Sequence, residues 1–314
     1  MGRRSDTGQI DWATPCWREM LIYQREAMWI EGALERTALW LDLQPGMTTV
    51  DVGCGLGYLG YTYWPYVGTG GRYIGIDVSP ALIRDARASA TEWSTGGRAC
   101  FAVSDAYHLP LPDDFADRVM CQTLLIHLEN PADALKEMAR VVKPGGLVVC
   151  HEPDNLSSLM PRYECSLPEL TIDEELLVAK VYMLSNQGRI RLGRGDKRTG
   201  AKVPGLMHQA GLSGIGVRLN ERVGFLAPPY DDERQQLTLV RLKKQWLDDE
   251  RRRIWFERER EEFLAGGGDP AEYGRYLKIA EASLGALKQQ LNAGEYSTCF
   301  SGDLYIARGV KPVS

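Results

Sequence analysis

The sequence lacks several features that would place a protein in a broad class at once. Its 314 residues include no run of about eighteen uncharged apolar residues, so we expect no membrane-spanning segment. Met1–Asp6 is polar and contains no apolar signal core. Basic residues are not in excess, with 37 Lys and Arg against 42 Asp and Glu and a net charge of −5. This balance argues against nucleic acid as a substrate, although it leaves room for a local basic patch.

Signatures of metal binding are also absent from the sequence. There are seven cysteines and four histidines, but no C-x-x-C pair and no His/Cys cluster at zinc spacing, so no metal site is expected. Cys100, Cys121 and Cys150 fall within or beside apolar runs, where a thiol behaves as a small hydrophobe. The pattern favours reduced core cysteines in a cytoplasmic protein.

Short apolar runs alternate with helical stretches through the middle of the chain. A hydrophobic content of 44% permits one large domain or a domain with a substantial insertion. Ser79-Pro80 and Asn130-Pro131 are typical helix starts, and Lys143–Gly146 ends a helix before a strand. Alternation of this kind predicts a parallel sheet covered by helices on both faces. The predicted strands are 47–52, 72–77, 98–103, 117–122, 145–151 and 214–219, and the predicted helices are 58–65, 80–93, 131–142 and 200–210.

A glycine-rich turn follows the first of these strands. Glycines occupy positions 53, 55, 57 and 60, and Asp77 lies at the carboxyl end of the second strand. In an open α/β sheet, ligands lie over the carboxyl ends of the strands, where glycine permits close backbone approach and an acid accepts hydrogen bonds from ribose hydroxyls. Together the two features predict a cofactor that contains a nucleoside.

The choice of cofactor depends on the residues further along the chain. Gly55, Gly57 and Gly60 match the dinucleotide fingerprint G-x-G-x-x-G, but that match is a weak signal when it stands alone. Five stretches resemble, in order and spacing, the motifs of class I S-adenosylmethionine-dependent methyltransferases: Asp51–Gly57, Asp77, Ser104–Ala106, Asp117–Leu128 and Arg140–Gly146. The resemblance covers residues 45–155 well and the rest of the chain loosely.

The resemblance implies an α/β fold with a Rossmann-like, seven-stranded, mostly parallel sheet and helices on both faces. A strand over Cys299–Ala307 would close the sheet antiparallel to its neighbour. The expected domains are an N-terminal helical cap at 1–46 (with a helix over Trp17–Leu43), a methyltransferase core at 47–230, a helical insertion at 231–292 and the closing strand within 293–314. The core divides into a cofactor half, 47–155, and an acceptor half, 156–230.

The insertion itself is predicted to contain two helices on either side of a break at Gly266–Pro270. Three roles for it remain open. It would pack on the flank of the sheet, form a subunit contact in a homodimer, or cover the acceptor pocket as a lid.

The resemblance also implies a cofactor site. Asp51 would help to hold the ammonium group of the methionine moiety, Asp77 would bind the ribose hydroxyls, and Asp105 would accept a hydrogen bond from the adenine amino group. The full set of implied cofactor residues is Asp51, Gly53, Cys54, Gly55, Gly57, Asp77, Val78, Asp105, Ala106 and Gln122, with Thr123 beside Gln122. The alternatives are an ordinary tight turn for the glycines and a cap or turn role for Asp105.

Tyr23 and Arg25 are further cofactor candidates, because the first helix commonly lies over the cofactor in relatives. The basic run Gly188–Arg198 lies between the fifth and sixth strands, where relatives form the acceptor pocket. Arg189 or Arg194 would hold an anionic acceptor. A solvated loop is the competing interpretation of this run.

Two residues are candidates for catalysis. Methyl transfer from a sulfonium is an in-line displacement, which requires alignment and exclusion of water more than proton transfer. His127 follows the fourth strand, and because a histidine side chain ordinarily titrates near neutrality it is a candidate general base, or else a histidine that bonds to backbone. Glu152 ends the fifth strand and would bind an amine acceptor or act as a base, unless it is a solvated charge at the strand end.

We therefore predict a cytoplasmic methyltransferase that transfers a methyl group from S-adenosylmethionine to O, N or C of a small-molecule acceptor. A methyltransferase acting on RNA or protein is the first alternative, and it would need a basic surface that joins residues 189–202 to the N-terminal arginines. A nicotinamide-dependent oxidoreductase is the second alternative. A cofactor-binding protein without catalysis is the third.

Overall fold

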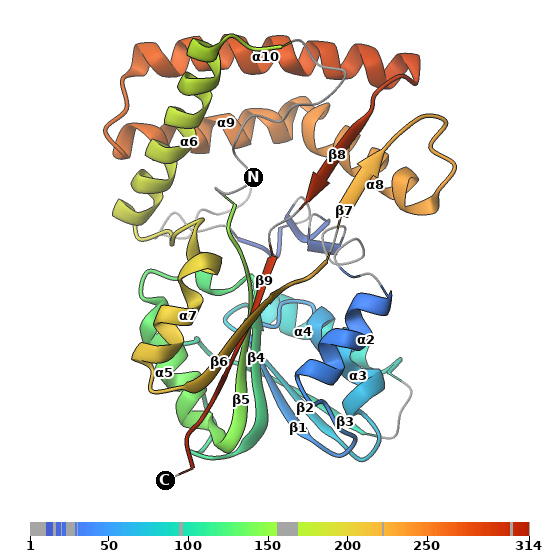
Figure 1. The fold of residues 1–314 in the computed structure, drawn as a ribbon, viewed down its shortest axis with the longest axis vertical. Coiled ribbons are helices and arrows are strands. Elements are labelled where there is room, and N and C mark those ends of the chain that lie inside the picture. Colours follow the sequence, from blue (N-terminus) through green and yellow to red (C-terminus); the bar gives the residue numbers. More distant parts are fainter. Residues whose placement is uncertain are drawn as a thin grey trace.

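The computed structural model describes residues 11–14, 17–19, 21–22, 29, 31–93, 97–155, 169–221, 223–301 and 304–313. Within these ranges the chain forms an α/β core and a layer of helices beyond one end of its sheet (Figure 1). We refer to four helices together as the helical layer: α6 (Ile172–Arg191), α8 (Glu233–Trp246), α9 (Asp249–Ala265) and α10 (Pro270–Ala293).

One seven-stranded sheet forms the centre of the core, and its strand order is β3-β2-β1-β4-β5-β9-β6. The first five strands pair in parallel, as expected for short apolar runs separated by helices. Their register places Val52, Ile76 and Cys121 side by side, so the glycine turn, Asp77 and Gln122 follow at the same edge. The strands are β1 (Thr48–Val52), β2 (Arg72–Asp77), β3 (Arg98–Val103), β4 (Ala116–Gln122), β5 (Val142–Pro153), β6 (Ser213–Leu219) and β9 (Leu304–Val310).

Helices cover both faces of this sheet, as the alternating pattern predicts. On one face α2 (Glu31–Trp40), α3 (Tyr58–Val67) and α4 (Pro80–Ala90) supply apolar side chains to a core with Tyr73 and Met120. On the other face α5 (Pro131–Val141) and α7 (Thr199–Gln209) pack on Val119 and Val148. Close packing of these two apolar cores against the sheet holds the carboxyl ends of its strands in fixed positions.

The end of the chain differs from the prediction of one closing strand at 299–307. β9 (Leu304–Val310) does run antiparallel to β5, and it also pairs antiparallel with β6. Thr298–Ser301, however, forms a separate strand, β8, which pairs with β7 (Val223–Leu226) in a two-stranded sheet outside the core. The predicted strand therefore began five residues too early and ended three residues too early, because its first part belongs to this separate two-stranded sheet.

The helical layer contains more helices than the sequence predicts. The stretch before the Gly266–Pro270 break is two helices, α8 (Glu233–Trp246) and α9 (Asp249–Ala265), because Asp248 caps a new helix by accepting from the amide of Arg251. The helix after the break, α10 (Pro270–Ala293), agrees with the prediction. A further long helix, α6 (Ile172–Arg191), was not predicted at all.

Two glycines allow α6 and α9 to cross in very close contact. A Cβ atom on Gly188 would overlap the carbonyl oxygen of Glu262, and a Cβ on Gly266 would overlap that of Leu184. The side chains of Val181 and Phe263 fill the adjoining apolar cluster. These contacts hold α6 tightly against α9 within the helical layer, and the chain continues from the end of α6 into α7 of the core (Figure 1).

Two further predictions about local structure were wrong. Trp29 is not helical, so the run Trp17–Leu43 is not one continuous helix, although α2 lies within it. Cys100 is exposed because β3 is an edge strand of the sheet, whereas Cys121 and Cys150 are buried as expected. None of the helices in the described ranges has the length and apolar content needed to cross a bilayer.

Candidate active site

The glycine turn after β1 lies against the end of β2. The amides of Gly53 and Cys54 both donate to the carbonyl oxygen of Ile76, at 2.7 and 3.0 Å. Gly53, Gly55 and Gly57 have φ angles of 70°, 54° and 78°, which are left-handed conformations that favour glycine. Gly57 then serves as the N-cap of α3. The turn therefore exposes backbone, rather than side chains, at the edge of the sheet.

A pocket of about 390 Å³ opens beside this turn. Asp51, Gly53, Cys54, Gly55 and Gln122 line it, which brings together five of the twelve predicted cofactor residues. A Cβ atom on Gly55 would meet nothing within 4 Å, so the turn is open to a ligand at that point. The volume lies in the range typical of small-molecule sites.

Asp51 is the buried acid of the pocket, with 1% of its surface exposed. Its Oδ2 accepts a 2.7 Å hydrogen bond from the hydroxyl of Tyr73 on β2. Burial and the Asp51 charge together hold the pKa of Tyr73 well above its usual value, so the hydroxyl keeps its proton and remains a donor. The arrangement fixes the direction in which the Asp51 carboxylate faces.

Asp77 joins the end of β2 to the glycine turn. Its Oδ2 accepts from the amide of Gly55 at 2.9 Å, and its Oδ1 accepts from the amide of Ser79 at 2.9 Å. Burial raises the pKa of the Asp77 carboxyl, and these two hydrogen bonds oppose the increase. Asp77 is not among the described residues that line the pocket, so its ribose-binding role stays a prediction.

The segment after β4 begins with a strained residue. Thr123 has a φ of 50°, which is uncommon for a β-branched residue and typical of functional sites. Its amide donates to the carbonyl oxygen of His151 at 2.8 Å, and a short 3-10 helix follows over Leu125–His127. We call residues 123–127 the β4 turn.

The carboxylate of Glu152 supports the β4 turn through hydrogen bonds to its backbone amides. Its Oε1 accepts from the amides of Leu124 and Leu125 at 2.8 and 2.9 Å, and its Oε2 accepts from the amide of Ile126 at 3.3 Å. The side chain is fully buried, and this burial raises its pKa to about 7. The interpretation of Glu152 as a solvated charge is therefore wrong. Glu152 is also absent from the described pocket lining, and its contacts make it a support for the turn.

Leu124 connects the β4 turn to the glycine turn. A Cβ atom on Gly53 would lie 2.7 Å from Cδ1 of Leu124, so the two backbones approach as closely as this leucine permits. His127, at the end of the same turn, lies 5.1 Å from the ring of Trp12 and outside the described pocket lining. Its role as a general base remains a prediction.

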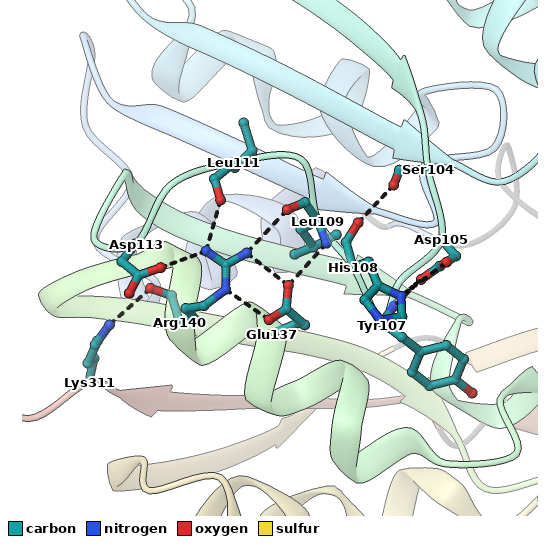
Figure 2. A network of polar contacts seen from close by, with 10 residues as sticks. All are labelled: Ser104, Asp105, Tyr107, His108, Leu109, Leu111, Asp113, Glu137, Arg140 and Lys311. Carbon is teal, nitrogen blue, oxygen red and sulfur yellow. Dashed lines mark hydrogen bonds and ion pairs between the residues drawn. The ribbon is translucent and has the colours of Figure 1, made fainter.

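Asp105 lies in the loop after β3, which is anchored from α5. The Asp105 carboxylate accepts from the amide of Tyr107 at 2.7 Å and lies 3.2 Å from Nδ1 of His108 (Figure 2). This is the turn role that was the alternative to adenine binding. Arg140 donates to the carbonyl oxygens of Leu109 and Leu111, so α5 fixes the loop (Figure 2).

Four of the remaining cofactor candidates lie outside the pocket or outside the described residues. The Val78 side chain is 70% exposed, which leaves it available to a ligand, and it is not among the described residues that line the pocket. Ala106 packs against the apolar core beneath the β3 loop. Tyr23 and Arg25 fall outside the described residues.

Sequence reasoning missed several residues that line the pocket. Arg18, Leu21 and Ile22 cover it from the N-terminal segment, and Arg18 forms a 3.0 Å ion pair with Asp85 of α4. Tyr58, Tyr61 and Trp93 add aromatic surface. The position of the N-terminal segment over the pocket was predicted in general terms, and the described residues of that segment that line the pocket precede Tyr23.

Two arginines of the basic run are buried, so the prediction of a solvated loop is wrong for Arg189 and Arg194, whereas Arg191 and Arg198 are exposed. Arg189 and Arg194 have 6% and 7% of their surfaces exposed. Both lie next to Glu262 of α9, at 3.5 and 3.8 Å. These guanidinium groups are therefore occupied by the protein's own carboxylate rather than presented to an anionic acceptor. No cluster of three His, Cys, Asp or Glu side chains suited to a metal ion occurs in the described residues.

Comparisons with known proteins agree with this geometry. Residues 50–150 match the family model of a methyltransferase domain. Residues 50–150 thus form a domain of the class I S-adenosylmethionine-dependent methyltransferase family. This confirms the predicted family and fold class and, with them, S-adenosylmethionine as the cofactor of the domain.

The relatives share the domain rather than the whole chain. An uncharacterised methyltransferase of Schizosaccharomyces pombe is 33% identical over 161 residues, which cover 50% of this chain and 53% of that protein. A ubiquinone/menaquinone biosynthesis C-methyltransferase of Coxiella burnetii is 33% identical over 110 residues, covering 35% of this chain and 44% of its own. The matched part of the chain thus spans about a third to a half of the length of each of these curated relatives.

One of the solved structures that this chain resembles is the YcgJ protein of Bacillus subtilis. It superposes with a TM-score of 0.47 and 18% identity, over 91% of this chain and 100% of that one. The residues of the pocket fit the methyltransferase cofactor on their own terms. Asp51 supplies a negative charge for a cationic group, and Gly55 leaves open space for it.

Proposed function

We propose that the protein transfers a methyl group from S-adenosylmethionine to O, N or C of a small-molecule acceptor. The observation that supports this most directly is the pairing of an open glycine turn with two acids at one sheet edge. Gly55 faces open space in the pocket, Asp51 lies inside it, and Asp77 bonds to the amide of Gly55. When bound, the cofactor supplies an electrophilic methyl group on a sulfonium.

In this proposal, the residues of the chain bind the cofactor and orient it. Asp51, fixed by Tyr73, holds the ammonium group, and Asp77 accepts from the ribose hydroxyls. Leu21, Ile22 and the pocket's aromatic side chains exclude water from the reacting atoms. Such a site needs alignment more than acid–base chemistry, which agrees with the absence of Glu152 from the pocket.

Two observations favour a small acceptor over RNA or protein. Arg189 and Arg194 are not available to a polyanion, because both are buried against Glu262. The net charge of −5 points in the same direction. The relative from Coxiella burnetii is named for C-methylation in quinone biosynthesis, which makes reduced quinones and other phenols sensible first acceptors. The match of residues 50–150 to a methyltransferase domain favours this proposal over the nicotinamide-dependent alternative.

The proposal is tested with S-adenosylmethionine that carries a labelled methyl group. The purified protein is incubated with panels of phenols, quinols and amines, and with RNA and unrelated protein, while S-adenosylhomocysteine is measured. We expect acceptor-dependent release of S-adenosylhomocysteine with one of the small-molecule panels. Label found on RNA or protein instead would contradict the proposed acceptor class. Cofactor binding without transfer to any panel would indicate a protein that has lost catalysis. Homodimerisation through the insertion stays a prediction.

A further inference from the structure

The helical layer contacts the β4 turn through a short glycine loop. Gly193 and Gly195 follow α6 with φ angles of 66° and 82°. A Cβ atom on Gly195 would overlap the carbonyl oxygen of Ile126, so this loop rests directly on the turn. The guanidinium of Arg189 reaches the same carbonyl oxygen at 3.5 Å.

A single carboxylate of α9 holds this loop and the end of α6 in place. Glu262 has 2% of its surface exposed and lies within 4 Å of four cations. The distances run from 3.1 Å for Nε of Arg258 to 3.8 Å for the groups of the loop. These cations are Arg189, Arg194, Lys197 and Arg258.

The burial of this cluster makes Glu262 important for its geometry. Burial lowers the pKa of Arg189 and of Lys197, and the charge of Glu262 counteracts that effect in both. Without the carboxylate, several buried cations would repel one another, and such uncompensated charges move toward water. The end of α6 and the glycine loop would then shift away from Ile126.

The β4 turn lies between this cluster and the glycine turn of the pocket. On one side of the turn, Glu152 accepts hydrogen bonds from the three consecutive amides of residues 124–126. On the other side, Gly195 and Arg189 contact the carbonyl oxygen of Ile126. Leu124, in turn, touches Gly53. A continuous series of packed contacts thus runs from α9 to the pocket.

We infer that Glu262 is a positioning residue for the cofactor pocket, acting through the glycine loop 193–195 and the β4 turn. The insertion then stays packed against the β4 turn and does not act as a lid that opens over the acceptor pocket. The inference rests on the proposed function only in naming the ligand of the pocket as S-adenosylmethionine.

The experiment compares Gly195→Ala with Gly193→Ala. Both changes place a Cβ at a positive φ in one loop, but only the first overlaps the Ile126 carbonyl, whereas the second meets the Glu129 side chain at 3.4 Å. Amide exchange over residues 123–128 and S-adenosylhomocysteine affinity by calorimetry are measured in the full chain. Coupling of this kind changes affinity by about 3- to 30-fold. We expect faster exchange and weaker binding for Gly195→Ala, and values near those of the wild type for Gly193→Ala.

A second pair tests the carboxylate itself. Glu262→Gln removes the charge with little change of shape, and Glu261→Gln removes a half-exposed neighbouring charge that pairs with Arg194. We expect Glu262→Gln to reproduce the effects of Gly195→Ala and Glu261→Gln to have little effect. Equal effects within either pair, or unchanged exchange over 123–128 in Gly195→Ala, would overturn the inference. If the wild type binds no S-adenosylhomocysteine, the proposed function fails, whereas the exchange measurements still decide whether the contact exists.

Discussion

The hydroxyl of Tyr73 on β2 donates a 2.7 Å hydrogen bond to the carboxylate of Asp51 on the neighbouring strand β1. Both side chains are almost completely buried, and Asp51 also lines the pocket. The tyrosine therefore determines where the negative charge of the pocket is directed. The sheet register supports the bond, since Tyr73 pairs with Thr49, two positions before Asp51 on β1.

Tyr73→Phe removes that bond and leaves the ring in place. We expect the free energy of unfolding to fall by roughly 1–3 kcal/mol, because a hydrogen bond to a buried charged group is lost. S-adenosylhomocysteine affinity should fall as well, since the Asp51 carboxylate is no longer held. Urea unfolding and calorimetry measure the two effects, with Tyr305→Phe on β9 as a control. Unchanged affinity would show that Tyr73 does not orient Asp51 for binding.

Gly60→Ala tests the packing of α3 on Tyr73. A Cβ atom at this position would overlap the Tyr73 ring, so the helix would have to move away from the sheet. We expect a destabilisation of about 1–3 kcal/mol, despite the better helix propensity of alanine. The matched control is Gly205→Ala in α7, where a Cβ meets nothing within 4 Å and a small gain is expected. A gain in both variants by thermal or urea unfolding would contradict the described packing.

Asp77→Ala tests the predicted ribose contact. The change should weaken cofactor binding by roughly 1–3 kcal/mol, the usual contribution of hydrogen bonds to a charged group. Asp133→Ala is the control, because that aspartate is exposed and lies on the far helix α5. Since Asp77 also bonds to the amides of Gly55 and Ser79, the folded fraction is measured alongside the affinity. Equal affinities in a fully folded variant would refute the ribose assignment.

Glu152 should make stability depend on pH in the neutral range. Its pKa is raised to about 7 by burial, so between pH 5 and pH 8 the folded protein retains a proton that the unfolded chain releases. The free energy of unfolding should therefore decrease as the pH rises through this window, by up to about 3 kcal/mol from this group.

Glu152→Gln removes the titrating group and keeps a hydrogen-bond acceptor. Urea unfolding of both proteins at pH 5, 6, 7 and 8 gives the difference in stability at each pH. We expect the difference to shift in favour of the variant as the pH rises, because other raised carboxyls such as Asp77 and Glu259 are present in both proteins. Parallel profiles would show that Glu152 does not titrate in this range.

The core of the fold was predictable because its signals are local. The bounds of β2 and β3 agree with the prediction to the residue, since apolar runs bounded by turn residues define them. The starts of α4 and α5 agree for the same reason, with proline at the first helical position in each. The glycine turn and Asp51 could likewise be predicted from the sequence, and the structure places both at the pocket.

What the sequence did not reveal depends on partners that are distant along the chain. Arg189 and Arg194 look like a solvated basic run until Glu262, about seventy residues later, is placed beside them. The burial of Glu152 follows from three amides of the β4 turn. Cys100 is exposed because β3 lies at the sheet edge, a consequence of strand order that its own apolar neighbours do not encode.

The most direct test of the account is a calorimetric titration of the purified protein with S-adenosylmethionine and S-adenosylhomocysteine, with NADH as a control. The account predicts micromolar binding of the first two, no binding of NADH, and a loss of affinity in Asp77→Ala. Binding of NADH alone, or of none of the three, would contradict the assignment of this pocket to S-adenosylmethionine.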